Sequence, residues 1–203
     1  MVFEGMGSRQ EPVQLLIAEM NHRWFNGLQV IEASLRRCSR HAASPDALRH
    51  NLAALSTQIQ AMAALHRRLS CLKRAGEGLE RHCQAICMDL AVAFGRPDVL
   101  PSVAMVEAGL SIRSEQRLVL IVVELMTNAL KHGRPPTSGG VVWIELGFFG
   151  EAELELVVTD NFEPPAAEPP MPAIVAALVE DLSGDLRVCC RPAYRTRVRF
   201  PLR

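Results

Sequence analysis

Two long amphipathic stretches separated by a short break constrain the fold of this chain more than any other feature. Over residues 14–40, apolar side chains recur every three or four positions, which is the spacing of a single stripe along a helix. A second stripe of the same kind covers residues 48–69. In the break, Ser44 is placed as a helix N-cap and Pro45 at the first helical position. The pattern predicts a helical hairpin.

A hairpin of only two helices leaves part of each apolar stripe in contact with water. Pairing with the same hairpin of a second chain would bury both stripes in a four-helix bundle. We therefore expect a homodimer held together by this hairpin.

The rest of the chain has a different pattern, and a glycine-containing segment over residues 73–80 is the predicted hinge. We therefore expect two domains, residues 1–75 and residues 76–203. In the second, the patterns predict helices over 79–94, 116–132 and 172–182 and strands over 102–106, 141–148, 153–159, 186–190 and 195–200. This grouping predicts an α+β sandwich with an antiparallel or mixed sheet.

The formal net charge is zero, with 22 basic and 22 acidic side chains. This balance argues against a protein that binds nucleic acid and against one that binds a membrane through a polybasic surface. The zero is the sum of unequal parts. Residues 1–82 hold 11 Lys or Arg and 7 Asp or Glu, a net +4, whereas residues 83–203 hold 11 and 15, a net −4. A basic surface on the first part would suit an acidic partner.

The sequence predicts a cytoplasmic protein without a membrane anchor. Its longest apolar stretch, residues 118–126, is interrupted by Glu124 and is far shorter than the roughly 20 residues that a span requires. The six cysteines lack paired CxxC spacing and follow no signal peptide, so we expect reduced thiols. Cys83 and Cys87 could share a helix face and bind a metal, but no second pair of ligands is near them.

One histidine on the first predicted helix is a candidate nucleophile. His22 falls off the apolar stripe, Asn26 shares its face, and Glu19 lies about one turn earlier. An exposed imidazole is nucleophilic near neutral pH, and a neighbouring carboxylate can hold its tautomer or take up its proton. A solvated surface histidine would have the same position, so position alone leaves both interpretations open.

Three sequence motifs give information about His22 and the second domain that the position of His22 on its helix does not. Residues 19–30 read EMNHRWFNGLQV and resemble the phosphoacceptor box of the histidine kinase subfamily called HisKA_2 or HWE-like. Residues 61–69, AMAALHRRL, resemble the second-helix signature of that subfamily, and residues 124–132, ELMTNALKH, are similar to its N-box. The resemblance implies that His22 accepts a phosphoryl group, with Arg23 as the residue that follows it. It also implies a GHKL, or Bergerat-like, sandwich for the second domain.

The same resemblance assigns roles around a nucleotide. Asn128 matches the magnesium-coordinating asparagine, and Glu124 the acidic residue one turn earlier. Lys131 and His132 match positions that approach the phosphates, and Asp160 matches the aspartate that reads adenine. The alternative for the helical residues is an ordinary polar face of a helix that packs on a sheet by its other side.

The nucleotide boxes depart from the family pattern. Phe162 and Pro164 stand where the family has the glycines of its Asp-x-Gly-x-Gly box, and residues 168–172 read EPPMP in place of a glycine-rich box. Proline offers no amide hydrogen to a phosphate, and the segment is short for an ATP lid. Ten acidic residues and no Lys or Arg occupy residues 145–185, so we expect ATP binding to be weak or absent.

Three functions follow as hypotheses. The first is a phosphorelay histidine phosphotransferase that shuttles a phosphoryl group between His22 and aspartates of response-regulator receiver domains, with no cofactor. The second is an ATP-dependent histidine kinase that autophosphorylates His22 and uses Mg-ATP. The third is a non-enzymatic module that binds a regulator.

Overall fold

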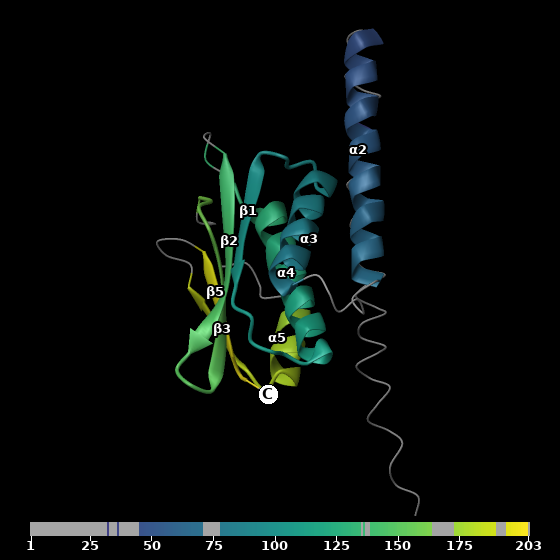
Figure 1. Ribbon diagram of the computed structural model, residues 1–203. Coiled ribbons are helices and arrows are strands. Elements are labelled where there is room, and N and C mark those ends of the chain that lie inside the picture. The colour runs from purple at the N-terminus through teal and green to yellow at the C-terminus, as the bar shows by residue number, and fades with distance from the viewer. Residues whose placement is uncertain are drawn as a thin grey trace, which may run out of the picture. The chain divides into compact units, whose positions relative to one another are not determined.

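The computed structural model (Figure 1) describes Glu32, Arg36 and residues 45–70, 78–134, 136, 139–163, 173–189 and 194–202. The chain divides into two compact units, Met1–Ser56 and Thr57–Arg203. Each unit is described by itself.

Helix α2 (Pro45–Ser70) begins at the proline that the sequence places at the first helical position. In its first turn, the Arg49 guanidinium donates a hydrogen bond to Asp46 at 2.9 Å. Leu48, Leu52 and Ile59 are large apolar side chains of the predicted stripe, and they are exposed. Of the predicted helix over residues 14–40, the structure describes Glu32 and Arg36, which are helical.

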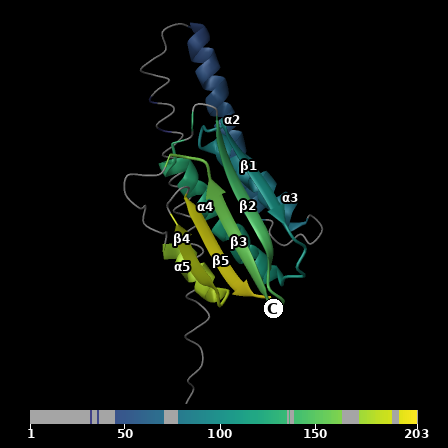
Figure 2. The same cartoon turned by 90° about the vertical axis from the view of Figure 1, so that its left-hand side faces the viewer.

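The second unit is built on a five-stranded mixed sheet with strand order β1-β2-β3-β5-β4 (Figure 2). The strands are β1 (Val99–Met105), β2 (Gly140–Phe149), β3 (Glu153–Asp160), β4 (Asp185–Cys189) and β5 (Arg195–Pro201). β1 is parallel to β2, and all other neighbouring pairs are antiparallel. Every second residue is buried from Gly140 to Leu146 of β2 and along β3 and β5, because successive residues of a strand point to opposite faces.

Helices α3 (Leu79–Ala93), α4 (Ile112–His132) and α5 (Ala173–Asp181) form a layer on the buried face of this sheet (Figure 1). α4 lies at the centre of the core, and its residues 118–123 are all buried. None of α3, α4 and α5 covers the other face of the sheet (Figure 2). The result is the two-layer α+β sandwich that the sequence predicts.

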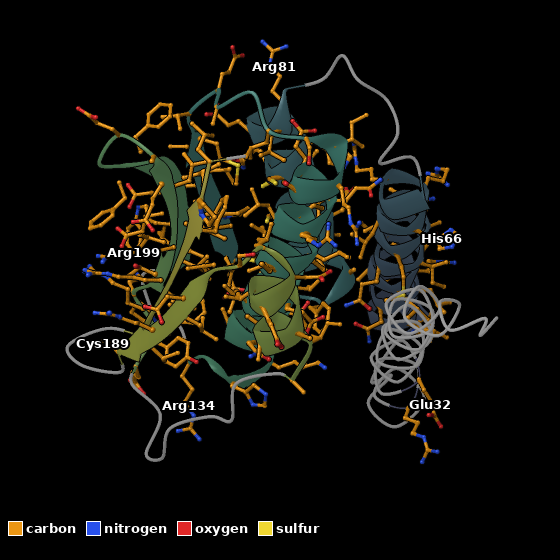
Figure 3. The ribbon with its side chains drawn as sticks, turned by 90° about the horizontal axis from the view of Figure 1, so that it is seen from below. Glu32, His66, Arg81, Arg134, Cys189 and Arg199 are labelled. Atoms are coloured by element: carbon orange, nitrogen blue, oxygen red, sulfur yellow. The ribbon has the colours of Figure 1, made fainter. Side chains whose placement is uncertain are left out.

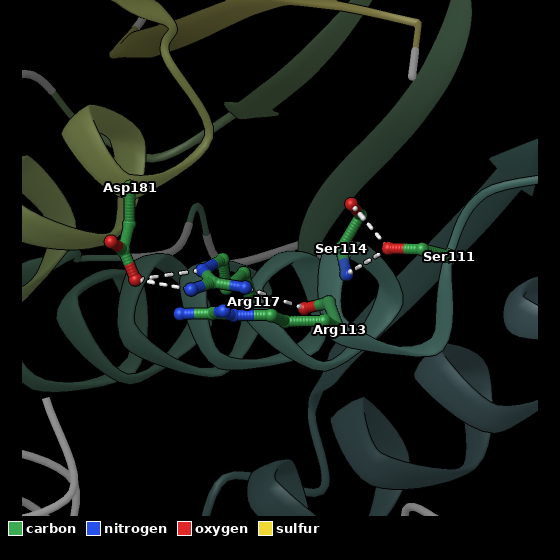
Figure 4. A network of polar contacts seen from close by, with 5 residues as sticks. All are labelled: Ser111, Arg113, Ser114, Arg117 and Asp181. Carbon is green, nitrogen blue, oxygen red and sulfur yellow. Dashed lines mark hydrogen bonds and ion pairs between the residues drawn. The ribbon is translucent and has the colours of Figure 1, made fainter. Parts of the chain in front are cut away.

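Polar contacts fix the start of α4 and its attachment to α5 (Figure 4). The Ser111 hydroxyl accepts a hydrogen bond from the Ser114 amide at 3.1 Å, which satisfies one of the free amides at the helix N-terminus. The Arg117 guanidinium donates to the Asp181 carboxylate at 2.8 Å. Because Ser111 is the cap, α4 begins at Ile112, four residues before the start that hydrophobic spacing predicts.

Two other predicted boundaries differ from the structure. β1 begins at Val99 rather than residue 102, because its parallel pairing with β2 extends to Val99 opposite Gly140. The predicted hinge over residues 73–80 is wrong at its end, since Leu79 and Glu80 belong to α3. Residues 71–77 lie outside the described residues.

Two further properties concern the described part of the chain. None of the helices there combines the length and hydrophobicity that crossing a membrane requires. Cys83 and Cys87 lie one turn apart on α3 and are fully buried. No group of three or more His, Cys, Asp or Glu side chains among the described residues could hold a metal ion.

Candidate functional site

The four residues predicted for phosphoryl transfer, Glu19, His22, Arg23 and Asn26, lie outside the described residues. Their roles therefore stay predictions from the sequence. The residues predicted around a nucleotide all belong to the described part of the second unit.

The C-terminal end of α4 and the end of β3 meet at a small cavity. Its volume is about 30 Å³, and its lining residues are Asn128, Ala129, His132, Gly133, Asp160, Phe162, Glu163 and Tyr194. The fold thus brings together three of the predicted residues, Asn128, His132 and Asp160, which are separated by up to 32 positions in the chain. The two other predicted residues do not line the cavity, since Glu124 is buried in α4 and Lys131 is exposed.

Asp160 is the last residue of β3 and is only 6% exposed. Its carboxylate accepts a hydrogen bond from the Phe162 amide at 3.1 Å. Burial raises the pKa of Asp160 above its usual value, and this hydrogen bond opposes the rise in part. The backbone of Asp160 is also fixed, because its amide donates to the Tyr194 carbonyl at 3.3 Å.

The residue after Asp160 attaches the chain to β2. The Asn161 side-chain oxygen accepts a hydrogen bond from the Val141 amide at 2.7 Å, and the Asn161 amide donates to the Val141 carbonyl at 3.2 Å. These two bonds extend the β2–β3 pairing past the end of β3. They also determine the direction in which the next side chain points.

That next side chain, Phe162, points inward and is 5% exposed. Its ring lies directly against Gly133, the residue that ends α4, and a Cβ atom added at Gly133 would overlap the ring. The Glu163 amide then donates to the Arg134 carbonyl at 2.9 Å, so the segments that follow β3 and α4 are joined by an antiparallel bridge. The Phe162 ring and this bridge narrow the space between α4 and β3.

The enclosed space between these residues is small. A volume of about 30 Å³ accommodates about one or two water molecules. Among the described residues, the Phe162 side chain thus takes up space that a glycine at its position would leave open. Residues 164–172, where the sequence lacks the glycine-rich box, lie outside the described residues.

From the sequence, Phe162 departs from a glycine pattern, and nothing in the sequence predicts that its ring packs on Gly133. Gly133 ends α4 as the sequence predicts, and the structure adds that a side chain there would collide with Phe162. Tyr194 lines the cavity, and a tyrosine just before a strand carries no signal of such a role.

Comparison with known proteins gives a family match for one part of the chain and a similar fold for most of it. Residues 19–80 match the family HisKA_2, histidine kinase. The fold is similar to the histidine kinase domain of the blue-light activated histidine kinase EL346 from Erythrobacter litoralis, with a TM-score of 0.56, 18% identity, and coverage of 86% of this chain and 96% of that domain. A longer EL346 structure gives a TM-score of 0.53 and 20% identity, over 98% of this chain and 62% of that one.

A third solved structure, titled as a bacterial phosphotransferase, has a TM-score of 0.50 and 13% identity, over 96% of this chain and 98% of that one. A search of curated sequences gave no match. At these identities the structural likenesses show a shared fold, and they confirm the GHKL-like architecture that the N-box suggests.

Proposed function

We propose, from the match of residues 19–80 to the HisKA_2 family of histidine kinases, that this chain is a histidine phosphotransferase of a two-component phosphorelay. His22 takes a phosphoryl group from the aspartate of one receiver domain and passes it to the aspartate of another. In the first step the aspartyl O–P bond breaks and an N–P bond forms at the imidazole. The second step reverses this change on a different carboxylate.

The residues around His22 suit this chemistry. A neutral imidazole is the nucleophile, and the Glu19 carboxylate holds its tautomer or takes up its proton. Arg23 and Asn26 follow within about one helical turn. A guanidinium and an amide at that distance can contact phosphoryl oxygens and orient the transferred group.

The observation that carries the proposal is the Phe162 ring packed against Gly133 in the place where the family binds its nucleotide. Phosphoryl transfer from ATP depends on positioning and on neutralising the charge of the phosphates. A cavity of about 30 Å³ beside a buried aspartate offers little of either. Transfer between aspartate and histidine needs no nucleotide and is compatible with a closed site.

The partners that we propose are response-regulator receiver domains and a second copy of this chain. The exposed apolar side chains Leu48, Leu52 and Ile59 of α2 are the surface that a four-helix bundle would bury. The net +4 of residues 1–82 complements the acidic phosphorylation pocket of a receiver domain. A solved bacterial phosphotransferase shares the fold, which is consistent with this function.

A second candidate is an ATP-dependent histidine kinase that autophosphorylates His22. It is favoured by the meeting of Asn128 and Asp160 at one cavity, as the N-box resemblance implies. For this function the Phe162 ring would have to leave Gly133 to admit the base, and the bridge between Arg134 and Glu163 would have to open.

Two labelling reactions separate the candidates. In the first, the chain is incubated with receiver domains that carry radiolabelled phosphoryl groups. Label should appear on the chain, disappear in His22→Ala, and persist in Asn128→Ala. In the second, labelled ATP and Mg²⁺ replace the receiver. Label that is lost in both variants would establish the kinase, and failure of every receiver to transfer label would overturn the phosphotransferase.

A further inference from the structure

The face of the sheet away from α3, α4 and α5 carries a row of arginines on β4 and β5. Along β5, Thr196, Val198 and Phe200 are buried in the core, so Arg195, Arg197 and Arg199 point to the other side. Figure 3 shows Arg199 and Cys189 on the side of the sheet away from α3, α4 and α5. β4 adds Arg187, which lies directly opposite Arg197 in the strand register.

Most of the contacts that these arginines make with carboxylates and aromatic rings lie at one end of the row. Arg199 donates to Glu155 of β3 at 2.7 Å, and its guanidinium lies 3.6 Å from the centre of the Phe149 ring. Asp185 is paired with Arg199 in the register of β4 and β5. This end of the row is therefore neutralised within the protein.

The other end of the row is less fully balanced: Glu145 of β2 lies opposite Val157, so β3 separates it from Arg197. Arg197 lies between Val157 on β3 and Arg187 on β4, and no hydrogen bond or ion pair is found for its side chain among the described residues. Arg195 donates only to a neutral hydroxyl, that of Thr159, at 3.2 Å. Arg187 contacts Asp185 at 2.9 Å, but its side chain is 70% exposed, and such surface pairs contribute little.

Two like charges placed directly opposite on neighbouring strands destabilise a sheet, so the pair Arg187 and Arg197 costs stability in the isolated chain. On the same face, Trp143 of β2 is paired with Thr159, which in turn is paired with Arg195, and Trp143 is 39% exposed. Arginine and tryptophan are enriched at the centres of protein interfaces. Here they lie on the same face of the sheet as the small apolar residue Val157. We call Trp143, Val157, Arg187, Arg195 and Arg197 the arginine face.

We propose that the arginine face binds a protein partner through an extended acidic segment, and that this binding does not involve His22. Arg195 and Arg197 are two residues apart on one strand, which places them about 7 Å apart. Alternate carboxylates of an extended peptide have the same spacing. The sequence pI of about 7.0 and the acidic end of the same row favour a locally acidic protein over a nucleic acid, which calls for a broadly basic surface.

The test uses the full chain and a fluorescein-labelled peptide of eight residues in which glutamate alternates with threonine. Fluorescence anisotropy should show saturable binding that weakens as salt is added. Reversing two charges, in the double variant Arg187→Glu and Arg197→Glu, should weaken binding roughly tenfold or more. The milder Arg197→Gln should produce a smaller loss in the same direction.

Arg113→Glu is the matched control, because Arg113 is an exposed arginine in the first turn of α4 (Figure 4) and its replacement changes the net charge by the same amount per site. It should alter peptide binding less than about twofold.

The single variant Arg197→Glu places opposite charges across the strands, so its melting temperature should rise while peptide binding falls. That combination excludes loss of folding as the cause of weaker binding.

Three results would overturn the proposal. The first is no saturable binding of the peptide up to about 1 mM. The second is equal weakening by Arg113→Glu and by the double variant. The third is a single-stranded DNA 12-mer that displaces the peptide and binds more tightly, which would assign the arginine face to nucleic acid.

Discussion

Replacing Phe162 by alanine tests the closed site directly. The ring is 5% exposed and packs on Gly133, and removing a buried phenylalanine costs about 3–5 kcal/mol. Phe162 borders the cavity of about 30 Å³, so water can enter the vacated space and we expect the lower end, about 3 kcal/mol. For a chain of this size, the melting temperature should fall by about 6–12 °C.

Urea unfolding followed by circular dichroism measures this loss. The midpoint should fall while the slope with denaturant stays the same, because the surface exposed on unfolding changes little. Phe148→Ala is the control, since Phe148 is a phenylalanine on the same sheet that is 56% exposed, and its replacement should cost less than about 1 kcal/mol. Equal losses in the two variants would refute the packing of Phe162 that the proposed function depends on.

Calorimetry with Mg-ATP extends the same experiment to function. The unaltered chain should release no binding heat, because the Phe162 ring occupies the space beside Gly133. Binding that appears only in Phe162→Ala would identify the ring as the obstacle to the nucleotide. Nucleotide binding by the unaltered chain would contradict the closed site and favour the kinase.

Three further predictions concern buried groups near the site and in the core. Asp160→Asn keeps the acceptor for the Phe162 amide and removes a buried charge. The folded-state pKa of Asp160 is raised above 3.8, so its contribution to stability is present below pH 3.8 and lost as pH rises through the folded pKa. The variant should therefore be more stable than the unaltered chain at pH 7 in thermal melts, and the difference should vanish near pH 3. Gly133→Ala should lower the melting temperature because the added methyl overlaps the Phe162 ring, and an unchanged melting temperature would count against that contact. Burial raises the pKa of Cys83 to about 12 and that of Cys87 well above 9.0, so thiolate-specific labelling at pH 8, located by mass spectrometry, should modify both only after unfolding.

Periodicity alone determined most of the secondary structure. The strands predicted over 141–148 and 153–159 correspond to β2 and β3, and the helix predicted over 79–94 corresponds to α3. These elements can be predicted from the sequence because buried and exposed residues recur with one period in a strand and with another in a helix. The predicted phosphoacceptor residues also come from the sequence alone, and they stay predictions.

Strand order could not be obtained in the same way. Alternation shows which residues of one strand share a face, but it does not show which strands are neighbours, because pairing depends on contacts between distant parts of the chain. The structure places β5 between β3 and β4, and this order sets Arg187 opposite Arg197. The sequence shows both arginines but not their juxtaposition.

The same distinction between sequence and tertiary structure holds for the site that Asn128 and Asp160 line. From the sequence, Phe162 is only a residue without the conformational freedom of the glycine that the family has there. The tertiary structure decides what the ring does, because Asn161 pairs with Val141 of β2 and turns Phe162 toward Gly133, 29 positions earlier in the chain. The sequence therefore determined which residues could form a site, and long-range packing decided that the Phe162 ring lies against Gly133.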